Sequence, residues 1–127
     1  MRYAFFMAIF ILSGCMWKTI EEANSGGLCI TQGESENSIA IGIQEGCTNG
    51  CTRDMDTECD ISLEGNTVTV TSMTTWETCV NCTCEDICIQ SAPTPCGEIG
   101  PIEAGTYTIV YGDVVIEKEL TKTDEAC

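Results

Sequence analysis

The chain contains no histidine and few basic side chains: five Lys and Arg residues stand against 20 Asp and Glu residues, giving a net charge of −15. Histidine is the commonest general base at neutral pH, so its absence weakens any acid–base mechanism. No Gly-x-Ser-x-Gly nucleophile elbow and no phosphate-binding glycine loop occurs in the sequence. Nucleic acid binding needs clustered Lys and Arg. The composition therefore predicts an acidic, non-catalytic protein with no cofactor and no nucleic acid partner.

Long hydrophobic runs are also missing. The longest, Ala4–Leu12, is much shorter than the about 20 apolar residues that a membrane-spanning helix needs. It follows the basic Arg2 and precedes the small residues Ser13 and Gly14. A basic start, a short apolar core and small residues at the end are typical of a secretory signal. We therefore expect a signal helix in residues 1–14 and export of the remainder.

The end of this segment, Leu12-Ser13-Gly14-Cys15, resembles the lipobox of bacterial lipoprotein signal peptides. The resemblance implies cleavage before Cys15, a diacylglycerol on the Cys15 sulfur and usually an acyl chain, such as palmitate, on the new amine. Two or three chains hold a protein firmly on a membrane, whereas one does not. The alternative is an ordinary signal peptide with a chance cysteine near its cleavage site.

The lipobox also implies a location and a domain plan. Some lipoproteins are retained in the inner membrane by an Asp after the lipidated Cys; Met16 gives no such signal, so we expect the bacterial outer membrane. Residues 15–27 are expected to be the lipidated Cys and a flexible tether, since Asn24–Gly27 would end any helix. Residues 28–127 then form one disulfide-rich β domain.

Cysteine is abundant, with 11 residues in a chain of 127. Lipidation of Cys15 leaves an even number, and export places these cysteines where disulfides form. We expect them to form five bridges whose pairing the sequence leaves open. The cysteines are Cys29, Cys47, Cys51, Cys59, Cys79, Cys82, Cys84, Cys88, Cys96 and Cys127.

Alternating apolar residues predict strands at Leu28–Gln32 and Ser38–Gln44. The clearest hairpin is Cys59–Met73, turned by Gly65-Asn66. This turn opposes Glu64 with Thr67, Leu63 with Val68, Ser62 with Thr69 and Ile61 with Val70, so apolar side chains meet on one face.

A second hairpin, Thr106–Tyr111 with Val114–Leu120, is predicted around Gly112-Asp113. Its apolar face would carry Tyr107, Ile109, Tyr111, Val114 and Ile116. Residues 45–58, before the first hairpin, are expected to be a loop. Residues 74–96, after it, hold five cysteines among polar and small residues, with a short strand expected at Ile87–Gln90.

About seven short strands without a convincing helix predict an all-β fold, a small antiparallel β-sandwich. The segment Glu103–Ile109 resembles the tyrosine corner of immunoglobulin-like domains, in which Tyr107 would open a strand. Ile109, however, stands where antibody domains carry their second core cysteine. The resemblance thus implies an immunoglobulin-like sandwich that is not a true antibody domain.

Two groups of residues are candidate metal ligands. The cysteines of residues 79–88 have spacings that could bind zinc or an iron–sulfur centre, and Cys79 with Cys82 could alternatively serve a thiol–disulfide enzyme. The acidic stretch 54–60 could surround Ca²⁺ with the carboxylates of Asp54, Asp56, Glu58 and Asp60. Disulfides and a solvated acidic segment are the preferred interpretations, so no metal is predicted.

The sequence thus favours a non-enzymatic lipoprotein whose β domain has a structural or binding role. Its membrane contact is the lipid on Cys15, and a protein or glycan partner stays open. Trp17 is expected to rest at the membrane interface, while Trp76 is either a core residue or an exposed binding aromatic.

Overall fold

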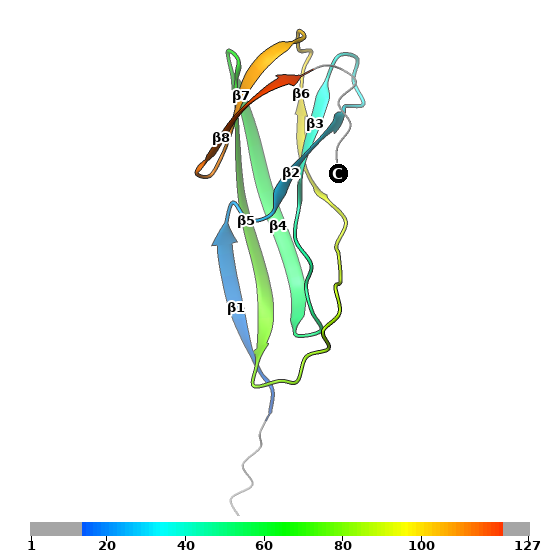
Figure 1. The fold of residues 1–127 in the computed structure, drawn as a ribbon, viewed down its shortest axis with the longest axis vertical. Coiled ribbons are helices and arrows are strands. Elements are labelled where there is room, and N and C mark those ends of the chain that lie inside the picture. Colours follow the sequence, from blue (N-terminus) through cyan, green and yellow to red (C-terminus); the bar gives the residue numbers. More distant parts are fainter. Residues whose placement is uncertain (1–13, 121–127) are drawn as a thin grey trace, which may run out of the picture.

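The computed structural model describes residues 14–120, which form an all-β fold of two sheets (Figure 1). The strands are β1 (Met16–Ala23), β2 (Gly27–Gln32), β3 (Ile39–Gln44), β4 (Thr52–Glu64), β5 (Thr67–Val80), β6 (Thr94–Ile99), β7 (Gly105–Tyr111) and β8 (Val114–Leu120). The predicted all-β, disulfide-rich sandwich class is confirmed. Residues 1–13 of the expected signal helix, and Cys127, lie outside the described residues. Within residues 14–120, no helix has the length and apolar character needed to cross a membrane.

The larger sheet is built on β5, which pairs with β4 along one edge. On its other edge, β1 pairs with the second half of β5 and β7 with the first half, and β8 follows β7. The smaller sheet has the order β2-β3-β6. In Figure 1 the long strands β4 and β5 run through most of the molecule, and the smaller sheet lies beside their upper half.

The hydrophobic core fills the space between the two sheets. Alternation along β3 turns Ile39, Ile41 and Ile43 inward, and all three are fully buried. They belong to a cluster with side chains from both sheets: Ile30, Val68, Val70, Ile99, Tyr107, Ile109, Tyr111 and Leu120. This burial of apolar surface stabilises the upper half of the molecule.

Within residues 14–120, no second sheet covers the lower half. There β1, β5 and β4 continue beyond the core, and the segments around residues 45–51 and 81–93 run alongside them (Figure 1). Disulfides Cys47–Cys88 and Cys51–Cys84 join these two segments, with Cα–Cα distances of 4.9 and 5.3 Å. Covalent links are the usual substitute where a small domain lacks apolar burial.

Two further disulfides join pairs of cysteines within residues 14–120. Cys59–Cys96 joins β4 to β6, and hence one sheet to the other, while Cys79–Cys82 closes the end of β5. Cys29 is also disulfide-bonded. The predicted disulfide bonding is therefore present, in a pairing that the sequence left open.

Both predicted hairpins are confirmed with their registers. Ile61 pairs with Val70 around the Gly65-Asn66 turn, and Tyr111 pairs with Val114 around Gly112-Asp113. The expected apolar face of the second hairpin is buried only on β7. Val114 and Ile116 are 56% and 41% exposed, because β8 is the edge strand of its sheet.

The expected tether is wrong for residues 16–23, which form β1. The sequence from Lys18 to Ala23 suits a helix about as well as a strand, but β5 offers a free edge rich in Thr, Val and Trp, which are strong strand formers. Pairing with that edge runs from Met16 opposite Val80 to Ala23 opposite Met73. Tertiary pairing thus overrides a weak local preference.

Three other expectations need correction. Half of the predicted loop 45–58 and the start of the cysteine-rich segment 74–96 are strand, since β4 begins at Thr52 and β5 ends at Val80. Residues 94–99 form β6, an edge strand that tolerates Pro95 at an irregular step of the pairing. The expected strand at 87–90 is reduced to a single bridge between Thr48 and Ile89.

The sheet is also not purely antiparallel, because β5 and β7 pair in parallel over four residues from Thr67 opposite Thr108. Residues 14–120 contain eight strands, where about seven were expected. At the start of β7, the Tyr107 hydroxyl donates a 2.8 Å hydrogen bond to the Glu103 carbonyl. This bond ties the start of β7 to the turn that precedes it.

Candidate functional site

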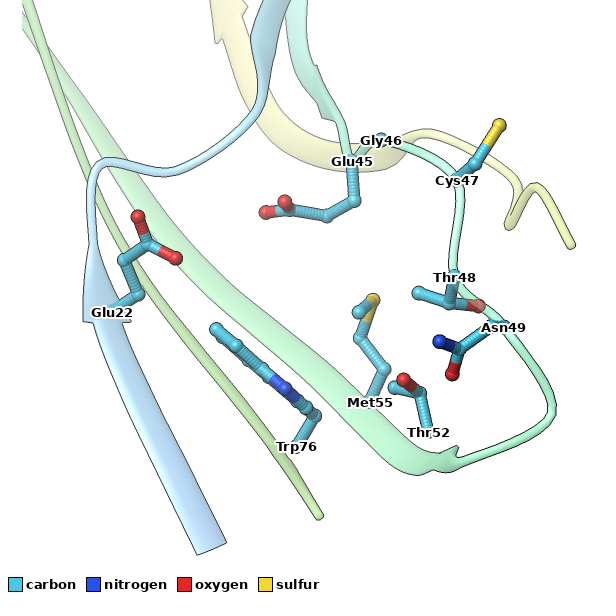
Figure 2. A pocket seen from close by; sticks show the side chains of 9 residues that line it. All are labelled: Glu22, Glu45, Gly46, Cys47, Thr48, Asn49, Thr52, Met55 and Trp76. Carbon is cyan, nitrogen blue, oxygen red and sulfur yellow. The ribbon is translucent and has the colours of Figure 1, made fainter. Parts of the chain in front are cut away.

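A cleft of about 260 Å³ lies in the lower half, between the β1–β5–β4 sheet and the segment that follows β3 (Figure 2). It is lined by Glu22, Glu45, Gly46, Cys47, Thr48, Asn49, Thr52, Met55 and Trp76. The missing second sheet explains its position, because a single loop segment covers less of the sheet than a neighbouring sheet would.

Strand alternation explains why Trp76 and Glu22 lie on one wall of the cleft. Trp76 pairs with Ile20 and Thr74 pairs with Glu22, so Trp76 and Glu22 extend from the same face of the β1–β5 ladder. Figure 2 shows the Trp76 ring and the Glu22 carboxylate at the side of the cleft opposite the loop. Trp76 is half-buried, so it is a cleft wall rather than a fully enclosed core residue.

Glu45 is the most enclosed polar group of the cleft, with 8% of its surface exposed. Its Oε1 accepts hydrogen bonds from the Thr74 hydroxyl at 2.7 Å and the Ser25 hydroxyl at 2.9 Å. The Thr74 and Thr57 hydroxyls lie 3.0 Å apart. Because Thr74 donates its one proton to Glu45, Thr57 must donate to Thr74. The carboxylate is thus held rigidly by groups from β4, β5 and the turn before β2.

A second chain of hydrogen bonds lies beside it. The Tyr111 hydroxyl donates to the Ser25 carbonyl, and Ser72 Oγ is 2.8 Å from the same hydroxyl. Burial raises the pKa of Tyr111, and the nearby Glu45 and Glu22 carboxylates add to that rise, while the Ser72 hydrogen bond opposes it. Tyr111 therefore stays a neutral donor, which fixes the Ser25 turn against β7.

The lining of the cleft mixes apolar and polar groups. It combines the apolar surfaces of Trp76 and Met55 with carboxylates and with hydroxyl and amide groups, and it contains no basic side chain. Such a mixture of aromatic surface and oriented polar groups is typical of ligand sites. The carboxylates are complementary to groups that donate hydrogen bonds or carry positive charge.

The other predicted site residues are placed as follows. Cys15 is exposed and carries no disulfide in the described part of the chain. Its Sγ lies within 4.8 Å of those of Cys79 and Cys82, the one grouping of metal-ligand type within residues 14–120. Two of those three sulfurs are bonded to each other. The structure also pairs Cys84 and Cys88 with cysteines of the 45–51 segment, so the 79–88 cysteines form disulfides rather than a set of thiolates.

The acidic stretch 54–60 belongs to β4 and faces solvent. Asp56, Glu58 and Asp60 alternate along the strand, which spaces them by about 7 Å. Asp54 precedes an irregular step in the β4–β5 pairing and has a φ of 52°. Within residues 14–120 these carboxylates do not converge as a metal-binding group.

Sequence reasoning missed Glu45. A signal was present: Ile39, Ile41 and Ile43 alternate inward, and Glu45 is the next residue in that series. A charged residue at an inward position implies a satisfied buried carboxylate. Its partners Ser25, Thr57 and Thr74 come from distant segments and carry no comparable signal.

No protein-family description matches this chain, and neither the curated proteins nor the solved structures include one that is significantly similar to it. The site is therefore interpreted from its own chemistry.

Proposed function

We propose that this protein is a lipid-anchored lipoprotein of the bacterial cell envelope, held on the outer membrane, with a non-catalytic β domain that binds a partner. The observation that carries the proposal is the free, exposed thiol of Cys15. Every other cysteine within residues 14–120 is disulfide-bonded, whereas Cys15 is free and exposed. Because Cys15 is exposed, its sulfur is accessible for acylation. Cys15 is also the cysteine that ends the lipobox-like sequence.

The binding role rests on the cleft at Trp76. A half-buried indole beside the rigidly held Glu45 carboxylate provides apolar contact and a fixed acceptor. A protein segment or glycan with donor groups fits this lining, and a basic side chain fits it particularly well. A cation that lies over the face of a Trp ring is attracted to the ring electrostatically.

A second candidate function has one specific observation in its favour. An unacylated Cys15 thiolate, close to the Cys79–Cys82 disulfide, could attack one of its sulfurs, form a mixed disulfide and release the other sulfur as a thiolate. That chemistry requires Cys15 to be free, so it excludes the lipid anchor.

Intact mass and a free-thiol assay on the natively exported protein distinguish the two functions. The lipoprotein should show the mass of the chain from Cys15 plus its acyl groups, and no reactive thiol. The Cys15→Ala variant should move from the detergent phase to the aqueous phase. Unchanged detergent partitioning of that variant, or one reactive thiol in the parent, would overturn the anchor.

A further inference from the structure

We infer that the lower end of the β1–β5 ladder docks on the surface of the bilayer, so that the domain is held directly against the membrane rather than above it on a tether. The inference rests on the proposed lipid on Cys15 and specifies how the domain sits on its membrane. The partner that this end of the ladder contacts is the headgroup and upper acyl region of the lipid layer.

The first argument is the length of the connection. Cys15 immediately precedes Met16, which is the first residue of β1 and pairs with Val80 at the end of β5. One residue spans at most about 3.6 Å. A lipid on Cys15 therefore leaves no room for a spacer, and the end of the ladder must lie at the level of the headgroups.

The second argument is the character of that end. Met16 and Val80 form a cross-strand pair, and they are 67% and 37% exposed. Trp17, half-buried, pairs with Cys79 on the opposite face of the ladder. The end thus presents apolar or amphipathic surface on both faces, and Trp is the side chain most enriched at membrane interfaces.

The third argument is the position of the cations. Only four basic residues follow the expected signal: Lys18, Arg53, Lys118 and Lys122. Alternation puts exposed Lys18 on the face of Met16, two residues further from the lipid. On the other face, the Arg53 guanidinium lies 3.9 Å from the centre of the Trp17 ring.

Each face therefore has apolar surface next to the lipid and a cation just beyond it. This is the arrangement in which Lys and Arg reach the phosphate level while nearby apolar groups enter the acyl boundary. Arg53 also pairs with Glu77 at 2.7 Å, which balances its charge. The docking accordingly uses apolar contact and does not require an anionic membrane.

Fluorescence quenching tests the inference, because the chain has two tryptophans. The lipidated protein is placed in neutral phosphatidylcholine vesicles that contain a lipid with a quencher near its headgroup. Trp76→Phe leaves Trp17 as the reporter. A distant reporter is Leu63→Trp in a Trp17→Phe, Trp76→Phe background, about 40 Å further along the β4–β5 hairpin. We expect at least threefold stronger quenching of Trp17 than of the Leu63→Trp reporter.

A matched pair of variants tests the contact itself. In the Trp76→Phe background, Val80→Asp should reduce the quenching of Trp17 by at least twofold. Val114→Asp changes a more exposed valine on β8, 56% against 37% for Val80, in a strand that does not belong to the β1–β5 ladder, and should leave the quenching unchanged. Equal effects of the two variants, or equal quenching of Trp17 and the Leu63→Trp reporter, would overturn the docking.

Intact mass separates this result from the proposed function. A lipidated protein with an unquenched Trp17 overturns the docking and leaves the anchor in place. A protein without lipid overturns the anchor and the docking together.

Discussion

Thr74 of β5 donates a 2.7 Å hydrogen bond to Glu45, the residue directly after β3. This bond joins the larger sheet to the end of the smaller one at the point where the core stops and the cleft begins. Thr74 is fully buried, so no water can replace its hydroxyl there. The relationship makes Glu45 both a structural link between the sheets and part of the lining of the cleft.

Thr74→Val should lower the free energy of unfolding by about 1–3 kcal/mol, because the buried carboxylate loses a donor without any change in side-chain shape. Urea unfolding followed by circular dichroism measures the loss. Thr71→Val is the control, since Thr71 lies on the same strand and is exposed; its effect should stay within about 0.5 kcal/mol. Equal losses in both variants would contradict the role assigned to the Thr74–Glu45 bond.

Removal of Cys51–Cys84 and of Cys59–Cys96 should have different consequences, although the sequence separations, 33 and 37, are similar. The chain-entropy contribution of each bridge is therefore about equal, roughly 3–4 kcal/mol. Cys51→Ala with Cys84→Ala should open the lower half locally, because loops rather than a sheet cover it. Cys59→Ala with Cys96→Ala should destabilise the whole sandwich.

Hydrogen exchange read by mass spectrometry distinguishes these outcomes. The first double variant should exchange faster in residues 45–52 and 81–93 while β3 and β7 keep their protection. The second should lose protection in all strands together. Uniform exchange in both variants would show that the two halves unfold as one unit.

The raised pKa of Tyr111 predicts a loss of stability in alkali. Burial and the Glu45 and Glu22 charges favour its neutral form. The folded state therefore holds the Tyr111 proton more tightly than the unfolded state. The corresponding stabilisation is complete below the ordinary tyrosine pKa of 10.0 and is lost as the pH rises from there through the folded pKa.

An absorbance titration of the tyrosinate checks this prediction. The sequence has three tyrosines, Tyr3, Tyr107 and Tyr111, and the difference between the parent and Tyr111→Phe isolates Tyr111. Its midpoint should lie above 10. Tyr111→Phe should also flatten the fall of stability in that pH range, and a midpoint at or below 10 would refute the buried donor role.

Gly26→Ala should be destabilising by about 1–3 kcal/mol. Gly26 has a φ of +77°, and an added Cβ would lie 2.7 Å from the Gln44 carbonyl oxygen and 3.1 Å from the Glu45 side chain. Both the backbone conformation and the close approach disfavour any side chain. The neighbouring Gly27→Ala is a strict control, because a Cβ there meets nothing within 4 Å. Thermal unfolding should separate the two variants clearly.

Local patterns in the sequence were sufficient to predict two hairpins and the registers of their strand pairs. The reason is that a two-residue turn and an alternating face constrain each other within about 15 residues of chain. The same alternation along β3 also predicts that Glu45 points inward. Its hydrogen-bond partners, however, are known only from the tertiary structure. Composition also indicated an exported, disulfide-bonded β domain, and the all-β fold and the disulfides are present.

Long-range pairing decided the rest. β1 exists because the second half of β5 offers an unpaired edge, and this edge brings Trp17 beside Arg53 and Cys15 beside Cys79. The disulfide pairing, the parallel β5–β7 contact and the cleft at Trp76 likewise join segments that are distant in sequence. Such contacts depend on the complete packing of both sheets, so only the tertiary structure could specify them.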